Sequence, residues 1–228
     1  MGVNFVVKTK DVIDALLGLP KSIYFCFKYL PLGLAIRLPV LLSRHVCLAN
    51  MKGMVHITAS KITVGLIKIG FGEVGIFDRK YSRTIWQNNG GGVTFKGKCS
   101  IGHGSRISVN KTGELILGEN FGISAESHIV CSRKIQFGND VLISWQCLIM
   151  DTDFHKVRTK MEQNLNQSIY IGNHVWIGCR STILKGAHIA DGCVIAANSN
   201  VVRGAYDNHA IIAGNPAKIV KREIEWER

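Results

Sequence analysis

The residues with the clearest chemical potential lie together at Asp151-Thr152-Asp153-Phe154-His155. A neutral imidazole accepts a proton near pH 7, and a carboxylate on its other nitrogen fixes its tautomer and orientation. We therefore predict that His155 is a general base, with Asp151 or Asp153 as the orienting carboxylate. Glu162, later in the same polar segment, is a third candidate for that partner. The simpler interpretation is a solvated surface loop, so the surrounding elements must decide.

The chain on both sides of this loop repeats every six residues. Aliphatic residues recur at Ile171, Ile177, Ile183, Ile189, Ile195 and Val201. Four places after each comes a compact side chain, at Val175, Ser181, Ala187, Cys193, Ser199 and Ala205. A period of six matches neither a helical face nor a single alternating strand. It is typical of short strands joined by tight corners, and it predicts a stacked parallel β-helix with about eighteen residues per coil.

The same repeat extends towards the N-terminus, less regularly, to about residue 51. Further sixes begin at Phe95, Leu117 and Phe137. The aliphatic register stops over residues 151–168, where charged and amide residues take over. A β-helix core does not need such an insertion, and long loops on a rigid scaffold frequently carry function. This context favours the general-base interpretation of His155.

The N-terminal residues 1–50 differ from the repeat. They are rich in leucine, isoleucine and aromatic residues, with lysines and arginines between them, and Pro20, Pro31 and Pro39 divide them into pieces too short to span a bilayer. Two compatible interpretations remain open. The segment forms short amphipathic helices that cap the open end of the β-helix, or it lies as a basic amphipathic segment on a membrane surface.

The C-terminal residues also leave the repeat. Gly214-Asn215-Pro216 indicates a turn, and Asn215 and Pro216 suit the first positions of a helix. We therefore expect three parts: a helical segment over 1–50, a β-helix domain over 51–214 that carries the loop 151–168, and a helix over 215–228.

Composition narrows the partners. The 228 residues carry a formal net charge of +12, but the basic residues are spread along the chain rather than gathered with aromatic residues as a nucleic-acid surface requires. A phosphate-bearing small molecule or an acidic membrane surface fits the charge. The seven cysteines lack CxxC spacing, and several occupy the compact position of the repeat, so neither disulfides nor a zinc site is predicted. Without a cleavable signal peptide, the expected location is the cytoplasm, either free or at the membrane periphery.

Three stretches resemble the hexapeptide-repeat acyltransferases: IGNHVWIG from Ile171, IAANS from Ile195 and GNPAK from Gly214. The resemblance spans about residues 95–222 and is greatest to the maltose, galactoside and nodulation O-acetyltransferases and to those of capsule and O-antigen clusters. It implies a left-handed parallel β-helix and a homotrimer with active sites between subunits. It also implies direct transfer of an acetyl group from acetyl-coenzyme A to a sugar hydroxyl, in surface polysaccharide biosynthesis.

The resemblance also implies roles for individual residues. His155 occupies the position of the base, and a backbone N–H at a glycine corner such as Gly178 would donate to the oxyanion. Cys179 and Ala197 would contact the pantetheine arm through their backbones. The basic residues expected to meet the nucleotide phosphates, or otherwise to be ordinary solvated charges, are Arg203, Lys218 and Lys221. Trp176 would line the acceptor cleft or pack at a corner. Ser124 stands where the family often has an acceptor-binding asparagine, which leaves acceptor binding open.

Two other functions are compatible with a β-helix. A metal-dependent lyase of the γ-carbonic anhydrase type needs three histidine ligands, two of them five residues apart, and no pair of histidines in this sequence has that spacing. No metal is therefore expected. A non-catalytic scaffold is the third hypothesis, and the Asp-Thr-Asp-Phe-His loop argues against it, because a scaffold has no use for a base.

Overall fold

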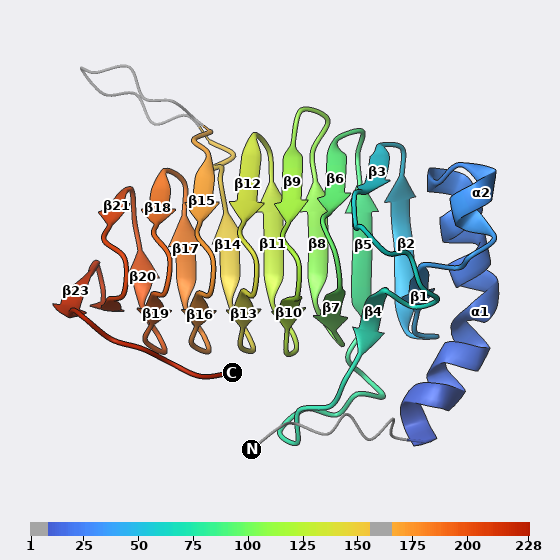
Figure 1. The fold of residues 1–228 in the computed structure, drawn as a ribbon, viewed down its shortest axis with the longest axis horizontal. Helices are drawn as coiled ribbons and strands as arrows, with labels where there is room; N and C mark the ends of the chain where they lie inside the picture. The colour runs from blue at the N-terminus through green and yellow to red at the C-terminus, as the bar shows by residue number, and fades with distance from the viewer. Residues whose placement is uncertain (1–8, 156–165) are drawn as a thin grey trace.

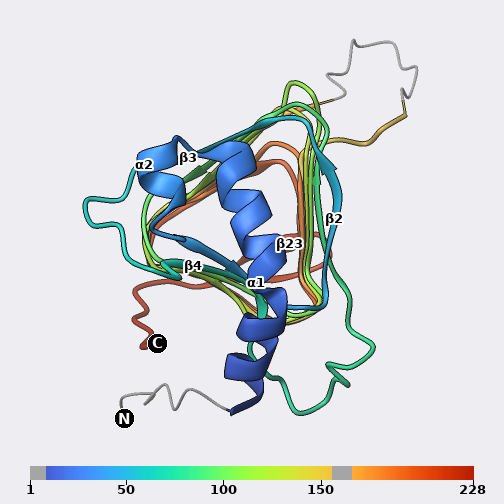
Figure 2. The same cartoon turned by 90° about the vertical axis from the view of Figure 1, so that its right-hand side faces the viewer.

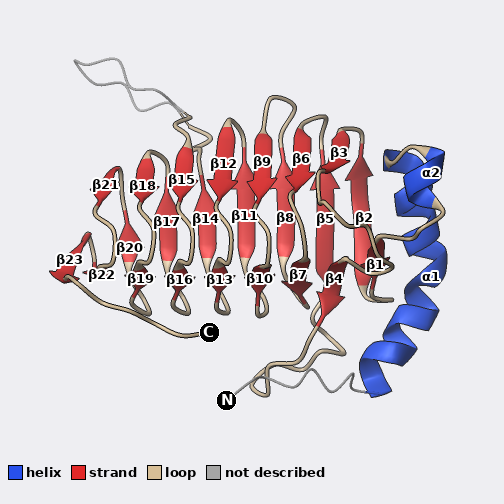
Figure 3. Cartoon of the chain, in the orientation of Figure 1, coloured by secondary structure: helices blue, strands red, loops and turns tan. Residues whose placement is uncertain are grey.

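The six-residue period folds into three parallel sheets that form the faces of a triangular prism (Figures 1 and 2). The structure is a computed structural model that describes residues 9–155 and 166–228. Each coil adds one strand to each sheet, so sequential strands from β1 to β22 lie on different faces. Strand and loop make up nearly everything beyond the N-terminal end (Figure 3).

The strands of each sheet lie side by side in a regular spatial order. Sheet A contains β1 (Val40–Leu42), β4 (Ile67–Phe71), β7 (Cys99–Gly102), β10 (Phe121–Ile123), β13 (Leu142–Ile143), β16 (Trp176–Ile177), β19 (Val194–Ile195), β22 (Ile211–Gly214) and β23 (Ala217–Lys221). Sheet B contains β2 (Val46–Met51), β5 (Thr84–Asn88), β8 (Arg106–Val109), β11 (His128–Cys131), β14 (Leu148–Met150), β17 (Thr182–Leu184) and β20 (Asn200–Val201). Sheet C contains β3 (Met54–Ile57), β6 (Gly92–Phe95), β9 (Glu114–Leu117), β12 (Lys134–Phe137), β15 (Ile169–Ile171), β18 (Ala187–Ile189) and β21 (Gly204–Tyr206).

The aliphatic residues of the repeat stack inside the prism. Ile177 pairs with Ile195, eighteen residues later, and all six repeat positions from Ile171 to Val201 are buried. Ile143 pairs with Ile177 across a much longer interval, because the loop after β14 intervenes. The predicted parallel β architecture is confirmed, and its stability comes from apolar area removed from water along this column.

The tight corners use left-handed backbone conformations. Between sheets A and B, one residue per coil has a positive φ, at Glu126, Gln146, Arg180 and Asn198. Between sheets C and A, the corresponding residues are Asn120, Asp140, His174 and His209. Asparagine, aspartate and histidine tolerate this region better than branched residues, which fits five of these eight positions.

One long helix and one short helix cover the open end of the prism. α1 (Thr9–Tyr29) continues through Pro20 rather than breaking there, and α2 (Leu32–Ala35) follows it (Figures 1 and 2). The proline is exposed, and packing on both sides holds the helix together: Phe25 meets Trp86 edge to face at 5.2 Å. Of the two interpretations of this segment, the structure shows the cap. None of the described helices is long and apolar enough to cross a membrane.

The helix also protects the edge of sheet A. The Ser22 hydroxyl accepts a hydrogen bond from the Leu42 backbone N–H at 2.8 Å, which satisfies a donor on the edge strand β1. A Cβ on Gly18 would lie 1.9 Å from the Leu42 carbonyl oxygen, so glycine is required for this close approach. Because β1 pairs with β4 in sheet A, the first coil begins at Val40, earlier than the boundary at residue 51 expected from the repeat.

The expected helix over 215–228 is wrong. Gly214, at φ +105°, is the last residue of β22, and after a turn at Asn215 and Pro216 strand β23 pairs antiparallel with β22. The last coil exposes backbone groups along the edge of β22, and pairing with Ala217–Lys221 satisfies them, which a helix would not do. The remaining residues 222–228 run back along the corner between sheets C and A (Figure 1).

His174 holds this C-terminal tail. Its Nδ1 lies 2.6 Å from a carboxylate oxygen of Asp140 and its Nε2 lies 2.9 Å from the Trp226 carbonyl oxygen, so both nitrogens face acceptors and the charged imidazolium satisfies both. The Trp226 ring stacks on the imidazole at 4.1 Å. The hydrogen bond to Asp140, and then that to Trp226, raises the pKa of His174 above its ordinary value of 6.5.

We expect attachment of the tail to depend on pH. Because the pKa of His174 is raised in the folded state, its contribution is complete below pH 6.5 and is lost as the pH rises through the raised value. Hydrogen exchange at residues 222–228 should therefore accelerate, beyond the intrinsic effect of pH, on going from pH 6 to pH 8. The His174→Ala variant should lack that extra acceleration. Equal acceleration in the two proteins would contradict a role of His174 in holding the tail.

Candidate active site

Asp151 is buried and serves the backbone rather than His155. Its carboxylate accepts hydrogen bonds from the backbone N–H groups of Ser132 at 2.6 Å and of Arg133 and Lys134 at 2.8 Å each. These three bonds fix the corner of the preceding coil, and Asp151 is fully buried. The expectation that Asp151 orients His155 is therefore corrected, since the carboxylate has a structural partner set one coil away.

The two ends of the loop are fastened to each other and to the next coil. Thr152 forms an antiparallel bridge with Asn166, and the Gln167 N–H donates to the Asp151 carbonyl at 3.1 Å. The Asp153 carboxylate lies 2.5 Å from Nζ of Lys185. Asp153 therefore has a partner in the next coil, and its role in orienting the base stays a prediction. Glu162, the third candidate, lies outside the described residues.

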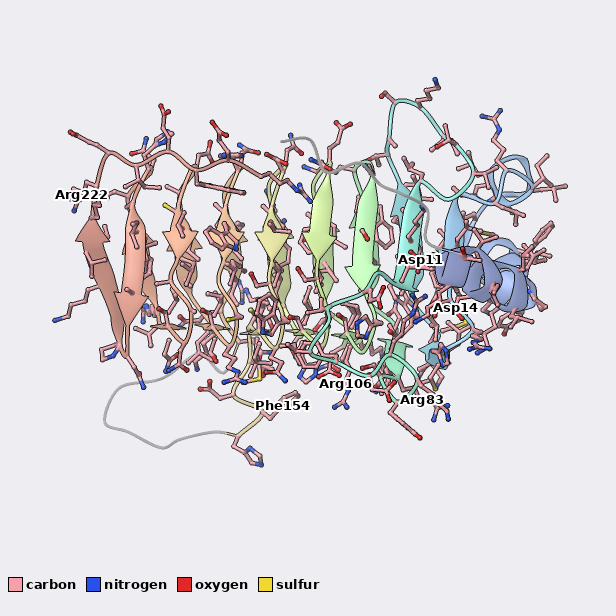
Figure 4. All side chains as sticks on the ribbon, turned by 90° about the horizontal axis from the view of Figure 1, so that it is seen from below. Asp11, Asp14, Arg83, Arg106, Phe154 and Arg222 are labelled. Atoms are coloured by element: carbon pink, nitrogen blue, oxygen red, sulfur yellow. The ribbon has the colours of Figure 1, made fainter. Side chains whose placement is uncertain are left out.

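His155 follows a strained residue. Phe154 has φ +60° although it is not a glycine, and its N–H donates to the Thr152 hydroxyl at 3.1 Å. The left-handed region is costly for a bulky side chain and such residues cluster at functional sites. His155 is exposed, with its N–H donating to the Asp153 carbonyl at 2.7 Å. Figure 4 places Phe154 on the same side of the prism as Arg106 of sheet B.

The residues expected to bind coenzyme A lie elsewhere, at the corner between sheets A and B. Gly178 and Cys179 form this corner in one coil and Ala197 forms it in the next. The Gly178 N–H donates to the Ile195 carbonyl at 2.8 Å, so it is not available to an oxyanion. The neighbouring Cys179 N–H and the Ala197 N–H have no acceptor within the described part of the chain. Cys179 thus replaces Gly178 as the available donor.

Gly178 instead holds the stacked corners together. A Cβ on it would lie 2.7 Å from the Ala197 nitrogen, too close for any side chain. Its carbonyl accepts a weak hydrogen bond from the Cys147 thiol at 3.2 Å. Burial raises the pKa of Cys147 to about 11, so this cysteine stays a neutral thiol at physiological pH.

His155 lies apart from Cys179 and Ala197 within one chain. His155 follows the corner between sheets B and C, while Cys179 and Ala197 lie at the corner between sheets A and B. The strands of sheet B separate the two corners, and β14 alone spans about 10 Å at 3.3 Å per residue. Within one chain, His155 and Cys179 therefore lie beyond opposite ends of the sheet B strands.

The remaining expected site residues are scattered. Arg203 lies at the corner between sheets B and C, and Lys218 and Lys221 lie on β23, all three exposed. Trp176 is both packed and accessible: its Nε1 donates to the Ser144 hydroxyl at 3.1 Å, and 38% of the residue remains exposed. Ser124 stacks one coil before Ser144, with its N–H donating to the Ile143 carbonyl at 2.8 Å.

Sequence reasoning missed Lys185, which joins the loop to the next coil. It follows the buried residue of β17 by two positions, where the repeat places a corner, and a lysine at a corner beside an acidic loop is the only signal it gives. Within residues 9–155 and 166–228, no three His, Cys, Asp or Glu side chains gather as metal ligands would.

Comparison with known proteins identifies the family. The model for bacterial transferase hexapeptide (six repeats) matches residues 168–203. WbbJ of Escherichia coli K12, provisionally named a lipopolysaccharide biosynthesis O-acetyl transferase, is 30% identical over 145 residues, which cover 59% of this chain and 74% of that protein. The chain belongs to the hexapeptide-repeat acyltransferases.

Two further relatives extend the comparison. An uncharacterized 24.8 kDa protein in the cps region of Klebsiella pneumoniae is 29% identical over 88% of this chain and 87% of its own length. The crystal structure of a polySia specific acetyltransferase aligns with a TM-score of 0.52 and 22% identity, over 83% of this chain and 79% of that one. This second likeness bears on the fold alone. As a member of the family, the chain is an acyltransferase.

Proposed function

We propose that this acyltransferase moves an acetyl group from acetyl-coenzyme A to a sugar hydroxyl during the synthesis of a surface polysaccharide. The observation that carries the proposal is an exposed histidine on a strained, fastened loop of a hexapeptide-repeat acyltransferase. The name of WbbJ, which assigns it to lipopolysaccharide biosynthesis, supports a glycan acceptor.

In this mechanism His155 removes the proton of the attacking hydroxyl as its oxygen bonds to the thioester carbonyl carbon. Coenzyme A supplies the thioester and leaves as a thiol. The Cys179 N–H, which has no acceptor in the described chain, is positioned on the corner to donate to the oxyanion that forms. The Ala197 N–H, one coil along, is the proposed donor to the pantetheine arm. Arg203, Lys218 and Lys221 are the proposed partners of the phosphates, being exposed cations at the end of the solenoid.

The site is proposed to form between subunits of a homotrimer with a left-handed coil. The support is the separation of His155 and Cys179 onto opposite edges of sheet B. Trp176 and Ser124, on sheet A and at its corner with sheet B, are proposed to face the acceptor. The proposed transfer is direct, without an acyl-enzyme, and His155 activates the acceptor hydroxyl.

The test of activity is release of free thiol from acetyl-coenzyme A. The purified protein is incubated with acetyl-coenzyme A and free, nucleotide-linked or lipid-linked sugars. Mass spectrometry of the products then detects an added acetyl group. We expect thiol release that depends on one class of sugar. Absence of transfer to every sugar, with transfer to an amine instead, would contradict the proposed acceptor chemistry.

The test of the shared site is complementation. The His155→Ala variant loses the base, and Ala197→Trp blocks the proposed groove, so each homotrimer should be inactive. Trimers assembled from both chains should regain part of the activity, because some sites combine an intact loop with an intact groove. Absence of recovery in confirmed mixed trimers would place the whole site within one chain.

A further inference from the structure

The outward face of α1 is entirely apolar. Between Asp11 and Lys28 every exposed position of the helix carries an apolar or aromatic residue: Val12, Ile13, Leu16, Leu17, Pro20, Ile23, Tyr24 and Phe27. Leu32 and Ile36 of the following turn are also exposed, at 68% and 63%. We call these ten residues the cap face. An exposed apolar stripe along about 22 Å of helix is typical of an interaction surface.

Within residues 9–37, which include the cap face, the exposed charged residues are all basic. Lys10, Lys28 and Arg37 are exposed around it and have no ion pair in the described part of the chain. The acidic residues of α1, Asp11 and Asp14, lie on the side towards the solenoid, where Arg79 binds both and Arg44 also binds Asp14 (Figure 4). The helix therefore presents apolar side chains and cations without ion pairs to solvent. Its two carboxylates form ion pairs with arginines of the solenoid.

We propose that the cap face docks on the surface of a bilayer that contains anionic lipid. Apolar side chains enter the boundary between headgroups and acyl chains, Tyr24 lies at the polar level, and the three cations meet lipid phosphates. A second copy of the chain fits less well, because two α1 helices packed antiparallel bring Lys10 opposite Lys28, and two packed parallel bring like residues together. Either arrangement places cations against cations.

This docking is independent of the other face of the helix. Gly18, Ser22, Phe25 and Cys26 are buried, whereas Leu16 and Phe27 of the cap face are 65% and 50% exposed. The cap and the membrane contact are therefore two faces of one helix. We expect substitution of Leu16 and Phe27 to leave the fold intact, so the proposal can be tested on the whole protein.

The experiment is vesicle flotation of the full-length protein. Vesicles of phosphatidylcholine with phosphatidylglycerol should carry the protein upward, whereas vesicles of phosphatidylcholine alone should carry much less. The double variant Leu16→Glu/Phe27→Glu should lose binding at least tenfold. Neutralising Lys10, Lys28 and Arg37 to glutamine should weaken binding to the anionic vesicles on the order of a hundredfold, since each basic residue near such a surface contributes about 1 kcal/mol.

Val220→Glu is the matched control. Val220 is exposed to 63%, like Leu16 at 65%, but it lies on β23 at the opposite end of the prism, so its substitution should leave flotation unchanged. Equal flotation of wild type and the Leu16→Glu/Phe27→Glu variant would overturn the proposal. A second result would also overturn it: the wild-type protein does not float with vesicles, and its molecular mass by light scattering falls when the cap face is substituted. That result would assign the cap face to a contact with a second copy of the chain.

Discussion

The His155→Ala variant is expected to lower kcat for acetyl transfer about a hundredfold or more, the usual contribution of a general base. The side chain is exposed and forms no hydrogen bond in the described part of the chain, so its loss should leave the melting temperature and the assembly unchanged. Steady-state thiol release from acetyl-coenzyme A, with the acceptor found in the sugar screen, measures the effect.

His56→Ala is the control for this substitution. His56 is also exposed, but it lies on β3 of sheet C, away from the loop and from the corner that carries Cys179. Its removal should leave kcat within about twofold of wild type, a shift well below that of a lost base. Near-wild-type turnover in the His155→Ala protein would remove the histidine from the mechanism.

The Asp151→Ala variant should lower the free energy of unfolding by about 3 to 5 kcal/mol. The substitution leaves the N–H groups of Ser132, Arg133 and Lys134 without their acceptor, and bonds to a charged group contribute about 1.5–3 kcal/mol each before neighbouring groups and water compensate in part. Denaturant unfolding at a fixed protein concentration, followed by circular dichroism, measures the change.

Asp207→Ala provides the comparison. Asp207 is 59% exposed in its side chain and pairs with Arg222 on the surface, so its loss should cost at most about 1 kcal/mol. If Asp151→Ala instead left stability unchanged and abolished turnover, the carboxylate would be an orienting partner of His155 after all.

The sequence predicted the parts of the fold that depend on local period. All six aliphatic positions from Ile171 to Val201 are buried, and five of the six compact positions are too, Ala205 being the exception on the last coil. The period predicts which side chains face inward, because each short strand places one aliphatic residue of the repeat in the core. The loop 151–168 was visible for the same reason, as the place where the period stops.

Errors arose where the partner of a residue lies one or more coils away. Asp151 is close to His155 in sequence, yet the N–H groups that donate to its carboxylate begin at Ser132, in the preceding coil. The residues after Pro216 are charged enough for a helix, but the free edge of β22 determines their conformation. Pro20 does not end α1, because packing on the solenoid holds both halves of the helix. No local pattern contains these contacts.

The position of α1 across the end of the prism also sets a stand-off distance. Sheet B takes four strand spacings from β2 to β14, about 19 Å at 4.8 Å each, and α1 adds a layer about 10 Å thick. With the cap face on a bilayer, the loop that carries His155 stands roughly 30 Å from the lipid. If His155 is the base and the acceptor is a glycan on a lipid carrier, as we propose, this distance excludes the first sugar on the carrier and selects a glycan several sugars long.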